Sequence, residues 1–217
     1  MVGAKVLLAG VLLALVCAAS AAADDPTVRI TKADQARAEA ALLTLKDFGV
    51  GWTGGPKTPA KLHAPKCPGF DPKESDLTVT GHAEAQFVFP RQVQFDQDVQ
   101  VLESADAVST DFRRVIGPKL AACLAYQLKA GKEVVSARVT KLPFPKLGDA
   151  RAAYRGTVVL RIGGRNVKVV KDYIFIGTGR LEYSLAVEAG AGAAREVMSF
   201  EQSVAQALVK KAGANVA

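Results

Sequence analysis

The sequence predicts an α+β fold in which helices flank a largely antiparallel sheet of about six strands, in a sandwich-like arrangement with one disulfide. Most of the alternating segments follow one another through short turns, which is typical of antiparallel strands rather than of parallel strands joined by helices. Segments with helical apolar spacing stand before, between and after these strands. A composition of 49% apolar and 23% charged residues is that of an ordinary globular domain.

Residues 1–23 have the three-part layout of a secretory signal peptide: Lys5, then an apolar run over 6–16, then small residues that include Ala21 and Ala23. The sequence therefore predicts a secreted or extracytoplasmic protein of the cell envelope, with residues 24–217 as a single domain. An uncleaved anchor is the alternative, because 6–23 carries no charged residue and about 20 apolar residues span a bilayer. Val16 stands where a lipobox requires Gly, Ala or Ser, which argues against lipid attachment at Cys17. No later segment is long and apolar enough to suggest a membrane span.

Removal of residues 1–23 would leave two cysteines, Cys67 and Cys123, in an oxidising compartment. We expect them to form a structural disulfide. Closing a loop of this length would remove unfolded-state entropy worth about 4 kcal/mol. A nucleophilic or metal-binding cysteine is the alternative, but neither cysteine lies in a C-x-x-C pair, and only His63 and His82 could assist.

In the first part of the chain, Thr31 and Asp34 form a helix-capping pattern, and apolar residues at helical spacing predict a helix over 32–48 that stops at Gly49. Residues 49–81 are rich in Gly, Pro and Lys, so we expect an irregular ordered loop pinned by Cys67. Alternation predicts strands over 82–88 and 92–102, on either side of Pro90.

Ser104 is expected to open a helical region that Gly117-Pro118 divides in two, with Cys123 on the inner stripe of its second part. A strand follows over 133–142, and then a meander of strands at about 150–162, 165–176 and 180–188. A helix over 193–211 ends the chain.

The Gly163-Gly164 turn fixes the register of the first hairpin, which places Arg155 opposite Asp172 as a cross-strand ion pair. For the second turn we expect three residues, so that Phe175 pairs with Leu181. One face of the meander is then apolar. The other face carries most of its charged side chains and is expected to be mostly exposed to solvent.

The order Gly51-Trp52, Cys67, Cys123-Leu124 and Gly148-Asp149 resembles that of actinobacterial exported domains related to the extracellular sensor domain of PknH-type serine/threonine kinases. LpqN-type lipoproteins and PsbP-like sandwiches are neighbours of these domains. The resemblance would span about residues 30–211. It implies an antiparallel sheet with flanking helices, a disulfide, and a role in binding or sensing without catalysis. The PknH-type sensor domain is similar to a domain with two disulfides, whereas residues 24–217 allow only one. No functional residue of the family matches well enough to be assigned here.

Catalytic equipment is sparse, so the sequence predicts a protein that is not an enzyme and uses no cofactor. His63 and His82 are the only histidines, and we expect both to be surface residues. No G-x-S-x-G or H-E-x-x-H motif is present, and no metal site is expected. We interpret Asp24-Asp25 and the pair Asp96 and Asp98 as solvated surface charge. The glycine pairs lack the spacing of a phosphate-binding loop.

The formal net charge of +7 favours an anionic partner, and export argues against nucleic acid. The first hypothesis is a binding or sensor-like domain that holds an anionic or amphiphilic envelope ligand, either on the sheet face around Arg155, Arg161 and Lys168 or under the Trp52 loop. The second is a structural protein that docks an envelope protein through its sheet or an edge strand. The third is an enzyme of unfamiliar type.

Overall fold

A computed structural model describes residues 24–89 and 93–214, with side chains to residue 212. The expected signal peptide over 1–23, with Cys17, and Pro90 lie outside the described residues.

The described residues confirm an α+β fold with a mostly antiparallel sheet. Its strands are β1 (Thr27–Val28), β2 (Thr53–Lys57), β3 (Thr78–Phe89), β4 (Val93–Leu102), β5 (Val134–Lys141), β6 (Ala150–Ile162), β7 (Arg165–Thr178) and β8 (Leu181–Gly190). They lie in the order β1-β3-β4-β8-β7-β6-β5, with β2 also paired to β3. Only the short β1–β3 pairing is parallel. The sheet therefore has eight strands instead of about six.

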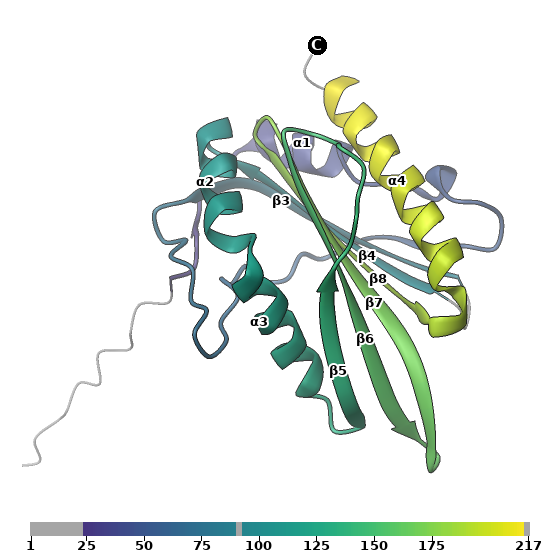
Figure 1. Cartoon of the computed structure of the whole chain (residues 1–217). Coiled ribbons are helices and arrows are strands. Elements are labelled where there is room, and N and C mark those ends of the chain that lie inside the picture. Colours follow the sequence, from purple (N-terminus) through teal and green to yellow (C-terminus); the bar gives the residue numbers. More distant parts are fainter. Residues whose placement is uncertain (1–23, 90–92, 215–217) are drawn as a thin grey trace, which may run out of the picture.

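Helices cover parts of both faces of the sheet (Figure 1). On one face lie α1 (Lys32–Ala40) and α4 (Ala194–Ala214), and on the other lie α2 (Ala105–Val115) and α3 (Pro118–Lys129). Short 3-10 turns at Leu45–Asp47 and Ala191–Ala193 complete the elements. No helix in the described part of the chain is both long and apolar enough to cross a membrane.

Helix α1 begins where the capping pattern predicts and ends earlier than expected. The Thr31 hydroxyl accepts a hydrogen bond from the Asp34 amide at 3.1 Å. After Ala40 the buried side chain of Gln97 accepts from the Leu43 amide at 2.9 Å and donates to the Ala41 carbonyl at 3.3 Å. These backbone groups are satisfied by a distant strand, so the predicted helix over 32–48 is wrong beyond residue 40.

The segment expected to be an irregular loop over 49–81 contains β2 and the start of β3. Gly and Pro within Thr53–Lys57 argued against a strand, but β2 lies at an edge of the sheet, where both are tolerated. Near Cys67 the chain folds back on itself through two backbone hydrogen bonds with Phe70. Cys67 and Cys123 form a disulfide with their Cα atoms 5.3 Å apart, so the predicted bond between this segment and α3 is confirmed.

The meander has the predicted register in its first hairpin but not in its second. Ile162 pairs with Arg165 and Arg155 with Asp172, as expected. The second turn has two residues, so Thr178 pairs with Leu181, and the expected pairing of Phe175 with Leu181 is wrong. Phe175 instead pairs with Ser184, a register shift of three residues, and an odd shift moves the inward positions of β8 to the opposite face.

The prediction of a solvent-exposed sheet face is also wrong. Asp172 and Ile174 are both fully buried, on the face that α1 and α4 cover. On the opposite face a second apolar cluster contains Phe70, Leu120 and Tyr154 together with the disulfide. The domain therefore has a core on each side of its sheet, and polar side chains between β4, β8 and α2 are left to line a cleft.

Candidate functional site

A cleft crosses the face of the sheet that carries α2 and α3. It consists of two cavities of about 290 and 210 Å³, and Tyr173, Phe175 and Ser184 line both of them. The first cavity lies against α2, α3 and the segment that contains His63, and the second lies over β4 and β8 beside Lys57. We call this site the carboxyl cleft, because six carboxylic acids line it: Glu74, Asp111 and Glu182 at the inner cavity, and Glu84, Asp96 and Asp98 at the outer one.

The inner carboxyl groups are held in an apolar environment. Phe112, Leu120 and Phe175 line the same cavity. The carboxyl groups of Asp111 and Glu182 bond to each other, and no nitrogen donor among the described residues bonds to the buried Asp111 Oδ1 or Glu182 Oε1. Burial raises the pKa of Glu74 to about 8. Burial also raises the pKa of Asp111, and burial together with the neighbouring Asp111 raises that of Glu182 well above its ordinary value. At neutral pH this end of the cleft therefore retains protons that a ligand could replace.

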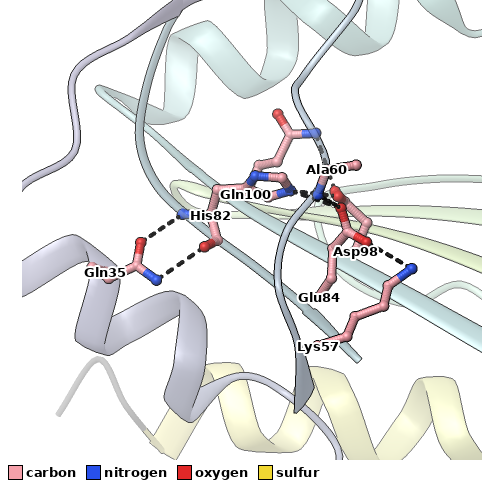
Figure 2. A network of polar contacts seen from close by, with 7 residues as sticks. All are labelled: Gln35, Lys57, Ala60, His82, Glu84, Asp98 and Gln100. Atoms are coloured by element: carbon pink, nitrogen blue, oxygen red, sulfur yellow. Dashed lines mark hydrogen bonds and ion pairs between the residues drawn. The ribbon is translucent and has the colours of Figure 1, made fainter. Parts of the chain in front are cut away.

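Two of the outer carboxyl groups, Glu84 and Asp98, belong to a network that Figure 2 shows from close by. His82 Nε2 lies 2.6 Å from Asp98 Oδ2, and Gln100 donates to the other oxygen of Asp98 at 3.1 Å. Lys57 forms an ion pair with Glu84 at 2.8 Å. The backbone amide of Ala60 donates to Glu84 at 2.7 Å. The outer end is thus negatively charged but internally hydrogen-bonded.

Strand register explains how these side chains meet. His82 and Glu84 are two residues apart on β3 and therefore share a face, and Glu84 lies opposite Asp98 on β4. Gln35 of α1 fills the space between β1 and β2 at the edge of β3. Its side-chain amide accepts from the His82 amide at 3.1 Å and donates to the His82 carbonyl at 3.0 Å (Figure 2). The Gln35 side chain thus takes the place of a neighbouring strand and fixes the backbone of His82.

His82, Glu84 and Asp98 could together hold a metal ion. One ligand atom from each lies within 4.8 Å of the others, close to the spacing around a small cation. All three side chains already have partners, however, since Asp98 is bonded to His82, and Lys57 and Ala60 occupy Glu84. A metal ion would have to displace the Lys57 ammonium group, because the hydrogen bonds and ion pairs within the network already occupy these three side chains.

The residues expected to bind a ligand do not gather at one place. Trp52 stacks on Phe200 of α4, with ring centroids 5.2 Å apart. Arg155 is held by Asp172 beneath α4. Arg161 and Lys168 are exposed, and Arg161 lies six residues along β6 from Arg155, a separation of about 20 Å.

Sequence reasoning missed the acids of the cleft and misplaced His82. His82 was expected at the surface but is only 7% exposed. Asp96 and Asp98 do share a face of β4, as alternation predicts, but this face borders the cleft, and Asp98 bonds to His82 instead of standing free in solvent. A signal was present in the chain, because His82, Glu84 and Glu182 interrupt segments that are otherwise strongly strand-forming.

No protein-family model and no curated protein matches this sequence. Its function therefore has to be inferred from the side chains of the carboxyl cleft and their surroundings.

Proposed function

We propose that this protein is a non-catalytic binding domain and that its carboxyl cleft takes a linear organic cation. The observation that carries the proposal is the pair of buried carboxyl groups of Asp111 and Glu182, which border a cavity and bond to each other, with no nitrogen donor on Asp111 Oδ1 or Glu182 Oε1 among the described residues. Two adjacent buried acids must keep a proton between them or face like-charge repulsion, and a bound ammonium group would supply both donors and opposite charge.

The charge of the cleft sets the sign of its ligand. Six acids line it, whereas its basic lining residues are Lys57, which is paired with Glu84, and His63, which is paired with Asp25. An anionic ligand of the kind expected from the net charge would be repelled by the negatively charged outer end and would find no unpaired cation at the protonated inner end. The cleft instead favours a cation, although the whole chain is basic.

The layout of the cleft suits an extended ligand. Glu182 lies opposite Gln100 in the sheet, and Asp96 lies four residues before Gln100 on β4. About 13 Å therefore separates the inner end of the cleft at Glu182 from the outer end at Asp96. Tyr173 and Phe175 border both cavities and offer apolar contact to a hydrocarbon chain. A polyamine, with ammonium groups separated by methylene segments, has this pattern of charge and apolar surface.

The disulfide supports an extracytoplasmic setting for this binding, because such bonds persist in oxidising compartments. The resemblance to exported sensor domains points the same way. We propose that residues 1–23 direct export and that the domain works in the cell envelope.

Calorimetric titration of the purified protein with spermidine tests the proposal. We expect binding, and we expect the double variant D111N/E182Q to weaken it at least about tenfold, since it removes two charge-assisted contacts. The matched control is E188Q, which makes the same substitution on β8 outside the two cavities and should bind as the wild type does. No measurable heat with spermidine, or equal affinities for all three proteins, would refute the proposal.

One observation favours a second candidate, an acid–base hydrolase. Asp111 and Glu182 adjoin each other in a cleft, and both have raised pKa values, a pattern that also occurs in pairs of catalytic carboxyl groups. Glycosidase and esterase substrates distinguish the two functions. Turnover that D111N abolishes and E188Q leaves intact would establish the hydrolase and displace the binding domain.

A further inference from the structure

The β6–β7 hairpin extends beyond the helices at the end of the sheet far from α1 (Figure 1). Three of the large apolar side chains that the described structure leaves exposed lie at this end: Val135 at 52%, Ile162 at 49% and Val167 at 39%. Val167 pairs with Leu160, two residues before Ile162, so Ile162 and Val167 share one face of the hairpin. An apolar side chain at a projecting tip gains nothing from the core of its own domain.

Basic side chains lie on both faces of the hairpin near these apolar positions: Arg165 shares the face of Ile162 and Val167, whereas Arg161 and Lys168 lie on the other face. Lys132, Arg161, Arg165 and Lys168 are all exposed here, and the nearby acid is Glu133, whose carbonyl accepts from the Arg161 amide at 2.8 Å. None of the four bases takes part in an ion pair within the described part of the chain. We call Val135, Ile162 and Val167 with these four bases the hairpin tip.

We propose that the hairpin tip docks the protein on the surface of an anionic lipid bilayer. Half-exposed aliphatic side chains bordered by Lys and Arg match the two layers of such a surface, since the apolar groups enter the acyl boundary and the cations meet the head groups. An acidic protein would need a shaped complementary face, whereas the tip is narrow and convex. The inference is independent of the carboxyl cleft, which lies elsewhere on the sheet.

Co-sedimentation of the purified protein with vesicles tests this proposal. The vesicles are phosphatidylcholine with or without phosphatidylglycerol, at low and high salt. Each base near an anionic surface changes the partition coefficient about fivefold, so R161E/R165E/K168E should lower binding by about a hundredfold or more. I162S/V167S keeps every charge and should lower it about tenfold, because less apolar surface is buried.

A charge-matched variant keeps the test specific to the hairpin. K32E/K46E/K210E makes the same change in net charge at exposed positions on α1, its following turn and α4, and it should bind vesicles as the wild type does. Because residues 1–23 are the same in every variant, any effect of that apolar segment cancels. Circular dichroism and urea denaturation check that each variant is folded.

The outcomes separate the alternatives. Binding that requires phosphatidylglycerol, weakens with salt and is lost only in the hairpin variants supports the proposal. Equal loss in K32E/K46E/K210E would assign the effect to net charge and overturn it. It is likewise overturned if I162S/V167S binds normally, if the wild type does not bind, or if the wild type forms a dimer that I162S/V167S abolishes, since the occupant of the tip is then a second copy.

Discussion

Arg155 and Asp172 lie opposite each other on β6 and β7 and form an ion pair beneath α4. The Arg155 Nε donates to both carboxylate oxygens, at 2.8 and 3.1 Å, and its Nη2 also donates to the Ala194 carbonyl at 3.0 Å. Asp172 is fully buried. Three elements therefore meet at one guanidinium group, which links two strands to the first residue of the last helix.

Replacement of this arginine should be strongly destabilising. R155M leaves the Asp172 carboxylate buried without its cation, so we expect the free energy of unfolding to fall by about 3 kcal/mol. Urea denaturation followed by circular dichroism measures it. The double variant R155M/D172N should recover part of the loss, because it also removes the unpaired charge. A double variant no more stable than R155M would contradict this account.

Glu201 should make stability depend on pH. Its side chain is buried on α4 near Asp172, and burial, with Asp172 as a further cause, raises its pKa to about 9 from an ordinary value of 4.5. The folded state binds the proton of Glu201 more tightly than the unfolded state does. The contribution of this group to the free energy of unfolding is therefore complete below about pH 4.5 and is lost as the pH rises toward 9.

In the E201Q variant this side chain is neutral in both the folded and the unfolded state, so folding no longer requires a buried carboxyl group to stay protonated. It should match the wild type near pH 4 and be more stable by roughly 3 kcal/mol at pH 7. Thermal or urea unfolding at several pH values measures the difference. If the two curves stay parallel from pH 4 to pH 8, Glu201 does not titrate as described.

Gly81 should tolerate no side chain. A Cβ atom there would overlap the backbone carbonyl of Asp34, where α1 crosses β3. We expect G81A to destabilise the fold by about 3 kcal/mol, because backbone atoms cannot move aside as a flexible side chain can. G192A is the control: no atom lies within 4 Å of its Cβ position, and it should change stability by less than about 0.5 kcal/mol. Equal midpoints for the two variants would disprove the close contact.

Loss of the disulfide should weaken the whole domain. C67S/C123S frees the loop between residues that are 56 positions apart, and we expect about 4 kcal/mol less stability. Urea denaturation of the variant, compared with the wild type before and after reduction, checks this. The reduced wild type should match the variant, and an unaltered denaturation midpoint would show that the bond contributes little.

Binding of a cation in the carboxyl cleft should strengthen as the pH rises. Asp111 and Glu182 have raised pKa values and must release protons to pair with an ammonium group. Glu74 also lines the inner cavity and has a raised pKa, and the charge of Arg114 acts in the opposite direction on the pKa of Asp111. Between pH 5 and 8 the dissociation constant of spermidine should fall for the wild type and fall less for D111N/E182Q. Equal slopes for the two proteins would contradict the assignment.

Local patterns in the sequence predicted most of the fold, because periodicity and caps act over a few residues. Ser104 accepts from the Ala107 amide at 3.0 Å to start α2, and Gly117-Pro118 separates α2 from α3, both as expected. The features that were predicted wrongly depend on residues far away in the sequence. The end of α1 is set by Gln97, 54 residues beyond Leu43. The second turn of the meander was ambiguous because both faces of the sheet carry apolar residues, so neither register left an exposed apolar row.

The candidate site was the least predictable part of the molecule. Its acids come from the segment before β3, from β3, β4, α2 and β8, and none of these segments resembles a motif by itself. The net charge of the chain predicted an anionic ligand, whereas the cleft that we propose as the binding site is lined by carboxyl groups. Arg161 and Lys168, chosen from the sequence for their charge, lie on the projecting hairpin.

The Cys67–Cys123 bond limits what can enter the inner cavity. Cys67 belongs to the segment that contributes His63, Pro65 and Glu74 to the lining, and Cys123 lies on the helix that contributes Leu120 and Leu124. These two parts of the lining are therefore joined by a covalent bond, which limits how far they can move apart. We expect a ligand that fits between them as they stand, such as a narrow unbranched chain, to bind more readily than one that needs the two segments to separate.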